Sequence, residues 1–161
     1  MSSMLFFALM YKDNNILEKT INLLKNNFGD IIKKSEEYNF NFTDYYEKEF
    51  GNDLKKIIII FDKKINKKDL IEIKNKITEI EKEFSADGKR KINIDPGYID
   101  DKEVILASFK KKDFKENLGN GVYAHKVLEF VDGKVKEFWH TFPDYREEKL
   151  KKFLFGIAGA K

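Results

Sequence analysis

The hydrophobic positions of this chain alternate between short apolar runs and stripes at helical spacing. Met4–Tyr11 is a continuous apolar run, which is typical of a buried strand. Asp13 or Asn14 can cap the helix that follows, and Gly29 ends its pattern. The sequence therefore begins with a strand and a helix. The apolar stripe of this first helix consists of Leu17, Ile21, Leu24 and Phe28.

Two further strands and a second helix come next. Tyr38–Phe42 alternates aromatic and polar residues, which predicts a second strand, and Lys55–Phe61 is the clearest β-run of the chain. Asn66 is a natural N-cap for the second helix, and we expect Asp87-Gly88 to end it. The apolar stripe of this helix consists of Leu70, Ile73, Ile77, Ile80 and Phe84.

A fourth strand completes a recognisable order of elements. Lys91–Ile94 has the apolar pattern of a strand, and Asp95-Pro96-Gly97 after it predicts a turn, because Pro fixes φ and Gly accepts a positive φ. The order to this point is β-α-β-β-α-β. That order predicts the ferredoxin-like arrangement of an α+β protein.

The predicted core is extended by a fifth strand and a β-hairpin. Val104–Phe109 has the pattern of a strand, while Gly121–Val131 and Lys134–His140 flank Asp132-Gly133, a strong signal for a two-residue turn. In the register set by this turn, His125 faces His140 across the two strands, unless a β-bulge intervenes. The opposite face is then the core face, with Val122, Ala124, Leu128, Phe130, Val135 and Trp139.

The chain ends in a predicted helix that begins at about Tyr145. Asp144 and Glu147 have the spacing of a capping box before an apolar helical pattern. The predicted fold is therefore α+β, with a ferredoxin-like βαββαβ core, a fifth strand, a C-terminal β-hairpin and a final helix. Because no linker or internal repeat interrupts the pattern, we expect residues 1–161 to form a single domain.

Composition excludes several classes of protein. The chain has 161 residues, of which 37% are charged, and its 31 basic and 28 acidic residues leave a net charge of +3. So small a net charge argues against general binding to nucleic acid. Cysteine is absent, which excludes disulfide scaffolds, thiol catalysis and cysteine-ligated zinc. Because no apolar run approaches a membrane span and the N-terminus lacks the features of a signal peptide, we expect a cytoplasmic protein without a membrane partner.

Three predicted loops place a carboxylate beside a phenol. These are Asp44-Tyr45-Tyr46, Asp95 with Tyr98, and Asp144-Tyr145, and the only two arginines of the chain, Arg90 and Arg146, lie near two of them. Carboxylates accept hydroxyl or amine protons, tyrosine offers a stacking face with a polar tip, and arginine binds anions. The structural alternative is that these residues support turns, cap helices and cover the edges of the core. A shared cleft between at least two loops would favour ligand binding.

Other catalytic and metal-binding patterns are limited. The chain has no GxSxG, GxxxxGK[ST] or GxGxxG motif, and Gly119-Asn120-Gly121 reads as a plain turn. His125 and His140 are candidate metal ligands if they face each other and a carboxylate supplies a third ligand. There is no HExxH motif and no third histidine.

Several segments resemble one uncharacterised prokaryotic family, domain of unknown function 4416. Asn41–Gly51 (NFTDYYEKEFG) is similar to its DFTDYYEEEMG signature, and Asp87–Ile99 (DGKRKINIDPGYI) to its DGRRRVNLDPGYL. Val104–Ser108 (VILAS) resembles LVLAT, Gly119–Ala124 (GNGVYA) resembles LGxGIYAE, and Trp139–Arg146 (WHTFPDYR) resembles WTYPDYR. The order and spacing of these segments agree over nearly the whole chain.

The resemblance implies signature positions but no activity. Lys115-Glu116-Asn117 replaces a His-Arg pair of the family, and His125 replaces its Glu, so an anion-binding role of the basic pair and a family-wide histidine metal site are both in doubt here. The signature positions are Asp44, Tyr45, Tyr46, Arg90, Asp95, Gly97, Tyr98, Tyr123, Asp144 and Tyr145.

Three functional hypotheses follow. The first is a binding domain that holds a small polar or nucleotide-like ligand with its Asp and Tyr loops and flanking arginines. The second is a hydrolase dependent on a divalent cation, in which Asp44 and Asp95 hold the ion or act as general base. The third is an RNA-binding module, which the near-neutral charge disfavours. The candidate ligand-binding residues are Asp44, Tyr45, Tyr46, Arg90, Asp95, Tyr98, Tyr123, Asp144, Tyr145 and Arg146. The sequence leaves the cofactor, beyond a possible divalent cation, and the oligomeric state open.

Overall fold

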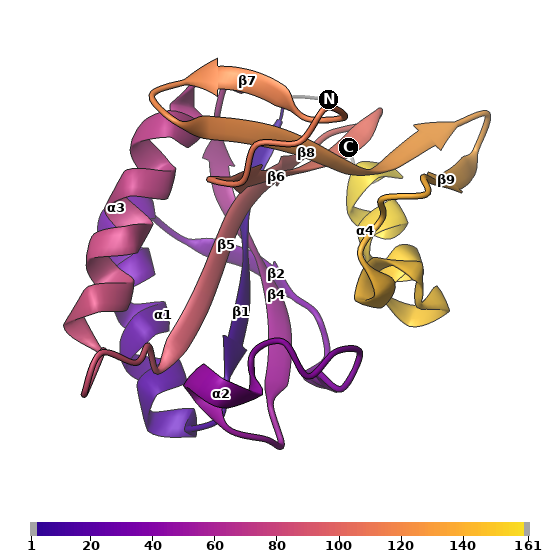
Figure 1. Ribbon diagram of the computed structural model, residues 1–161. Helices are drawn as coiled ribbons and strands as arrows, with labels where there is room; N and C mark the ends of the chain where they lie inside the picture. The colour runs from indigo at the N-terminus through magenta and orange to yellow at the C-terminus, as the bar shows by residue number, and fades with distance from the viewer. Residues whose placement is uncertain (1–2, 160–161) are drawn as a thin grey trace.

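A single antiparallel sheet runs through the computed structural model, which describes residues 3–159 (Figure 1). Its strand order is β2-β4-β1-β5-β6-β8-β7, with β3 also paired to β4 and β9 to β8. The nine strands in this part of the chain are β1 (Met4–Tyr11), β2 (Ile31–Lys34), β3 (Tyr38–Asn39), β4 (Lys55–Lys64), β5 (Ile92–Ile99), β6 (Glu103–Ser108), β7 (Glu116–Gly119), β8 (Val122–Val131) and β9 (Lys134–Glu137).

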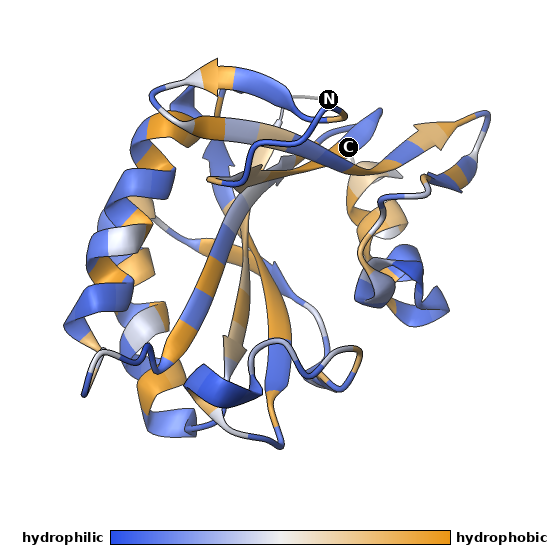
Figure 2. Cartoon of the chain, in the orientation of Figure 1, coloured by the Kyte–Doolittle hydropathy of each residue, from blue (hydrophilic) through white to orange (hydrophobic). Residues whose placement is uncertain are grey.

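Helices cover both faces of the sheet. Helices α1 (Asn14–Phe28) and α3 (Asp69–Glu83) lie on one face, and α4 (Glu148–Gly159) lies on the other (Figure 1). The short helix α2 (Glu47–Phe50) and the 3-10 turn η1 (Pro143–Arg146) complete the elements. The helices are apolar toward the sheet and hydrophilic outward, as Figure 2 shows for α1 and α3. Mixed α and β structure is therefore confirmed.

Strand β1 is the centre of the core. It pairs with β4 on one side and β5 on the other, so no polar edge is left open. Its side chains point alternately to the α1/α3 face and to the α4 face, and Leu5–Tyr11 is almost fully buried. This double burial explains why the sequence of β1 is continuously apolar instead of alternating.

The predicted turn at Asp95-Pro96-Gly97 is wrong, because all three residues lie inside β5. Pro96 is opposite Phe7 of β1, and the pairing of β5 with β6 begins only at Gly97. The missing N–H of Pro96 therefore costs no hydrogen bond to β6. Gly97 is needed for space instead of for a positive φ, since a Cβ there would lie 2.1 Å from the carbonyl oxygen of Ile105.

Strands β5 and β6 separate on the N-terminal side of Gly97. Their register covers only Gly97–Ile99 of β5, so the first half of β5 has a free edge toward β6. The Glu81 carboxylate of α3 satisfies part of this edge by accepting a hydrogen bond of 2.8 Å from the backbone N–H of Ile94. The pKa of Glu81 is raised, mainly because the carboxyl group is buried.

Other sequence predictions need correction near the first two helices. The second strand of the chain is β2 (Ile31–Lys34), and only Tyr38–Asn39 of the predicted second strand is extended in the sheet. The exposed, lysine-containing edge strand β2 gives no clear periodic signal. The second helix ends at Glu83, four residues before the expected Asp87-Gly88.

The N-terminus of α3 is also organised differently from the prediction. Asn66 does not cap the helix with its side chain; its backbone N–H instead donates to the Asp69 carboxylate at 2.7 Å. Strand β1 and helix α1 agree with the prediction, including the Asp13 cap, whose side chain accepts a hydrogen bond from the N–H of Asn15.

The C-terminal third contains one confirmed turn and two corrections. Asp132 and Gly133 both have positive φ and connect β8 to β9, as predicted. Strand β7 was not predicted; it pairs with β8 through a second turn at Asn120-Gly121. Helix α4 begins at Glu148, so the Asp144 side chain belongs to η1 and does not cap this helix.

The close packing at Gly97 gives a testable prediction. Gly97→Ala places a methyl group against the Ile105 carbonyl and the Phe6 ring, so we expect the free energy of unfolding to fall by about 3 kcal/mol or more. The matched control is Gly156→Ala in α4, where an added Cβ meets nothing within 4 Å. The control is expected to stabilise the protein by up to about 1 kcal/mol. Urea unfolding of both variants measures the difference, and equal effects would contradict it.

Candidate functional site

The sheet surface on the α4 side changes from apolar to polar along the strands. Close to α4 it is built from Phe6, Ile60 and Leu106, which are buried in one apolar cluster with the helix. Further along β4, β5 and β6, and on the adjoining β8, polar residues point to this side, while β1 between β4 and β5 stays apolar. We call this part of the surface the polar face. It consists of Lys56 on β4, Asn93 and Asp95 on β5, Ser108 on β6 and Tyr123 on β8.

A buried ion pair joins the polar face to η1. The Lys56 ammonium donates to Oδ2 of Asp144 at 2.7 Å, and the Tyr38 hydroxyl donates to the same oxygen at 2.8 Å. Lys56 and Asp144 are 6% and 2% exposed, so both charges are removed from water. Burial, followed by the charge of Asp144, raises the pKa of Tyr38 and keeps its hydroxyl protonated as a donor. Asp144 is therefore a partner of Lys56 and Tyr38 and not a helix cap.

Residues from all three Asp and Tyr segments, one of which is part of strand β5, act on one another electrostatically near this pair. Burial raises the pKa of Tyr46 to about 12, and the next largest cause is the charge of Asp95. The pKa of Tyr145 is also raised, first by burial and then by the charges of Asp144 and Asp95. The charges of Asp95 and Asp144 thus raise the pKa of both Tyr46 and Tyr145. The loops therefore contribute Tyr46, Asp95, and Asp144 with Tyr145 to one region.

Tyr145 has an unusual hydroxyl group. The residue is fully buried, and in residues 3–159 its hydroxyl has no hydrogen-bond partner. A buried hydroxyl without a partner costs about 1–3 kcal/mol relative to a bonded one. Such a group is satisfied when a water molecule or a ligand atom enters the site.

Four predicted site residues lie outside this convergence. Asp44 has an exposed side chain in the loop before α2. Tyr98 points to the opposite face of the sheet, into the α1/α3 core, and its hydroxyl donates to Glu103. Tyr45 is 63% exposed and contacts the ring of Tyr46 at 4.9 Å. Tyr123 lies on the polar face.

Both arginines are engaged in internal contacts. Arg90 binds the Glu49 carboxylate with two nitrogens at 2.7 and 2.9 Å and also donates to Asn93 at 2.9 Å. This bidentate pairing lowers the pKa of Glu49. Arg146 donates to Glu137 at 2.8 Å and to the carbonyl oxygen of Thr141 at 3.2 Å. Their guanidinium groups therefore hold α2 and η1 in place.

Sequence reasoning missed three lysines beside the polar face. The Lys110 ammonium lies 3.3 Å from the Tyr45 hydroxyl, and Lys115 donates to Ser108 Oγ at 3.1 Å. Lys74 of α3 comes within 4.0 Å of Asp95. The sequence does single out Lys74, because it lies four residues after Leu70, at a position on the apolar stripe of α3 where a hydrophobic residue is expected. A charged residue at a core-facing position is expected to have a specific partner.

The positive charges of these lysines repel one another. The pKa of Lys115 is lowered, mainly by burial and then by the charges of Lys110, Lys112 and Lys74. In the described part of the chain, Lys110 and Lys115 bond only to neutral groups and make no ion pair with a carboxylate. Asp95 is the single carboxylate paired with Lys74. We call Lys74, Lys110 and Lys115 the lysine cluster.

The two histidines meet, although not in the predicted strand register. The ladder of β8 and β9 ends at the pair Leu128 and Glu137, short of His140. Beyond it, His125 Nε2 lies 3.1 Å from both Nδ1 and the carbonyl oxygen of His140. Because a carbonyl only accepts, Nε2 of His125 carries the proton in the neutral ring, and Nδ1 is left without a partner among the described residues.

The environment of the histidine pair is apolar and positive. His125 is 1% exposed, so the face of β8 opposite to the predicted core face is also buried at this position. Its pKa is lowered to about 4 by burial, then by the charges of Lys115 and His140. Among residues 3–159, no group of three or more His, Asp or Glu side chains is arranged to hold a metal ion.

A groove of about 890 Å³ lies on the other side of Asp144, between residues 35–42 and the start of α4. Its apolar walls include Tyr38, Phe42 and Phe153. The charged residues that line it are Glu36, Glu37, Asp144, Glu147, Glu148, Lys149 and Lys152. The excess of carboxylates over lysines disfavours an anionic ligand in this groove.

The buried ion pair gives a prediction on stability. Asp144→Asn leaves the Lys56 ammonium buried without a counterion, so we expect a loss of about 3–5 kcal/mol in the free energy of unfolding. Lys56→Met is expected to cost a similar amount. The double variant Lys56→Met/Asp144→Asn combines the two changes, removes both charges and is expected to cost clearly less than the sum. Urea unfolding of the four proteins measures the coupling, and additive effects would show that the pair is not coupled.

The histidine pair gives a prediction on pH dependence. His125 binds its proton more weakly in the folded state, with a pKa of about 4, than in the unfolded chain. Its neutral form therefore contributes stability that is complete above about pH 6.5 and is lost as the pH falls toward 4, by up to about 3 kcal/mol. We expect the unfolding free energy of His125→Gln to fall less steeply than that of the wild type between about pH 6.5 and 4. Parallel pH profiles of the two proteins would refute this origin of the acid sensitivity.

Comparisons with known proteins place the chain in a family without naming an activity. Searches of curated proteins and of solved structures give no match. Among residues 3–159, none of the helices combines the length and the apolar character needed to cross a bilayer. The family model described as Domain of unknown function (DUF4416) matches residues 1–158. This match confirms the resemblance of the sequence motifs, and the chain belongs to the DUF4416 family.

Proposed function

We propose that the protein is a cytoplasmic binding domain whose polar face holds a small polar ligand with an anionic group. The observation that carries the proposal is the lysine cluster beside Asp95 and Ser108. Burial, and then repulsion by Lys110, Lys112 and Lys74, lowers the pKa of Lys115, and Lys110 and Lys115 have no carboxylate partner among residues 3–159. A bound anion would relieve this repulsion.

The cationic groups of this proposal differ from those expected in the sequence. Arg90 and Arg146 are already bound to Glu49 and Glu137, so releasing either would break a structural ion pair. Lys110 and Lys115 bond only to neutral oxygens, and these bonds can be exchanged for charge-assisted bonds to a ligand. We therefore assign anion recognition to the lysines.

Neutral and acidic groups nearby would orient the rest of the ligand. Asp95 is partly exposed and accepts a hydrogen bond of 3.2 Å from Asn93, which leaves carboxylate capacity for a ligand hydroxyl or amine. Tyr45 and Tyr46 supply aromatic surface at the edge of the polar face.

We also propose that β1, α1, β2, β4, α3 and β5 form a ferredoxin-like core within one domain. The strand order β2-β4-β1-β5, with every neighbouring pair antiparallel, supports this arrangement. Strands β6–β9 then extend the sheet beyond β5. In this arrangement the polar face lies where the core meets its extension.

The other two hypotheses receive less support. A metal-dependent hydrolase requires Asp44 and Asp95 to bind one ion, yet the Asp44 side chain is exposed and no metal-binding cluster is found among residues 3–159. RNA binding requires an extended basic track, and the lysine cluster is local. Binding of a small ligand needs neither feature.

The lysine cluster gives the test of the proposed function. We expect pyrophosphate to bind the wild-type protein and to raise its melting temperature at constant ionic strength. Lys110→Gln/Lys115→Gln removes two ammonium donors and is expected to weaken binding by about tenfold or more in calorimetry. The control variant is Lys19→Gln/Lys25→Gln, which removes two exposed lysines of α1 and is expected to bind like the wild type. Failure of the wild type to bind, or equal weakening in both variants, would refute the proposal.

A further inference from the structure

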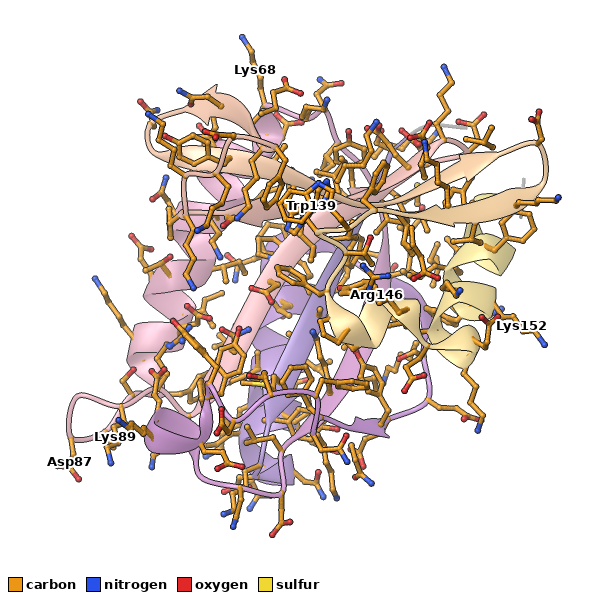
Figure 3. All side chains as sticks on the ribbon, turned by 45° about the vertical axis from the view of Figure 1, so that its right-hand side comes forward. Lys68, Asp87, Lys89, Trp139, Arg146 and Lys152 are labelled. Atoms are coloured by element: carbon orange, nitrogen blue, oxygen red, sulfur yellow. The ribbon has the colours of Figure 1, made fainter. Side chains whose placement is uncertain are left out.

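Trp139 is unusually exposed for a tryptophan. It is the only tryptophan of the chain and is 81% exposed, although the hairpin pattern predicts it on the core face. The ladder of β8 and β9 ends at Glu137, so the residues after it leave the strand register. In Figure 3, Trp139 and Arg146 lie in the segment between the upper strands and α4. The core prediction for Trp139 is therefore wrong.

The backbone that carries Trp139 is held firmly. Thr141 Oγ1 accepts a hydrogen bond of 2.8 Å from the N–H of Phe138 and donates to the carbonyl oxygen of Val127 at 2.6 Å. The Arg146 guanidinium donates to the carbonyl oxygens of Phe138, Trp139 and Thr141. The exposed indole thus projects from a fixed turn, and little backbone entropy would be lost if a ligand packed on it.

Neighbouring rings fix the indole as well. The His140 ring is stacked on Phe114 at 4.2 Å and on Phe138 at 5.1 Å. Trp139 packs edge-to-face against Phe114 at 5.1 Å and His140 at 5.3 Å. These contacts orient the indole and still leave most of its surface in water. We call Phe114, Phe138, Trp139 and His140 the aromatic platform.

The aromatic platform and the lysine cluster are adjacent. The Lys115 ammonium lies 5.8 Å from the centre of the Phe114 ring and 3.1 Å from Ser108 Oγ on the polar face. It also lowers the pKa of His125, which contacts the rings of Phe114 and His140. Phe114 therefore lies close both to the indole and to an ammonium group that is bonded only to neutral oxygens. A ligand that spans both must have a planar group and an anionic group.

From this adjacency we infer that the ligand of the polar face is a nucleoside phosphate whose base stacks on Trp139. The inference rests on the proposed anion site and adds the chemical class of the ligand. The phosphate binds Lys110 and Lys115, and the base covers the exposed indole. Stacking of a base on an aromatic side chain is worth about 1–3 kcal/mol and depends little on which base is present. Charge complementarity favours this occupant over an apolar partner surface.

The single tryptophan provides a direct readout. ADP, GDP, CDP and UDP are titrated against the wild-type protein, with pyrophosphate as the matched anion that lacks a base. We expect at least one nucleotide to quench the Trp139 emission and to bind about tenfold or more tightly than pyrophosphate. Pyrophosphate is expected to bind without comparable quenching.

Two substitutions separate stacking from anion binding in calorimetry. Trp139→Ala is expected to bring nucleotide affinity down to that of pyrophosphate while leaving pyrophosphate affinity unchanged. Trp139→Phe keeps a stacking ring and is expected to retain most of the nucleotide affinity. Because the indole is 81% exposed, neither change is expected to disturb folding.

The outcomes distinguish failure of this inference from failure of the proposed function. If pyrophosphate binds but all nucleotides bind equally well to wild type and Trp139→Ala, the base-stacking inference is overturned and the anion site stands. If a nucleotide quenches Trp139 but Lys110→Gln/Lys115→Gln binds it normally, the anion site is overturned. A wild-type dimer in sedimentation that Trp139→Ala dissociates would also overturn the inference, because a second copy would then cover the indole.

Discussion

The buried pair of Lys56 and Asp144 joins the two parts of this molecule on which the candidate site depends. Lys56 belongs to β4 in the first half of the sheet, and Asp144 belongs to η1, just before the helix that covers the same face. Two charges removed from water at this point restrict η1 to one position, because any displacement would leave an uncompensated charge in an apolar surrounding. The position of η1 in turn fixes the Tyr145 hydroxyl near Asp95 and the Arg146 guanidinium against residues 138–141. The ion pair of Lys56 and Asp144 therefore connects the polar face, through η1 and Arg146, to the backbone of the aromatic platform.

The sequence predicts those elements whose burial is uniform along their length. Strand β1 is covered on both faces and α1 has a regular stripe with an Asp cap, so pattern and structure agree in both. The errors arise where a tertiary contact replaces a local signal. Asp95-Pro96-Gly97 has the composition of a turn, yet the close approach of β6 to Gly97 and the separated strand edge at Pro96 allow an extended strand. Nothing local to that segment reveals where β6 lies.

In the candidate site, too, the sequence indicates some residues, while others depend on tertiary contacts. The Asp and Tyr pattern singled out Tyr46, Asp95 and Tyr145, and in the structure the charge of Asp95 acts on both phenols. Arginine was the expected anion ligand, but Arg90 is paired with Glu49, which is distant in sequence, and Arg146 with Glu137, across the end of the hairpin. Lys110 and Lys115 belong to a lysine-rich segment that looks like ordinary solvated surface. The contact of the Lys115 ammonium with Ser108 depends on how the segment between β6 and β7 folds back.

The separation of β5 and β6 brings a side chain of the α1/α3 layer into contact with the polar face on the other side of the sheet. Lys74 is rooted in α3, on the face opposite to the polar face, and its ammonium nevertheless approaches Asp95. The side chain thus crosses the plane of the sheet where the strands have parted. A negative charge placed near Asp95 would pull directly on a residue of the helical layer, without any movement of the strands between them.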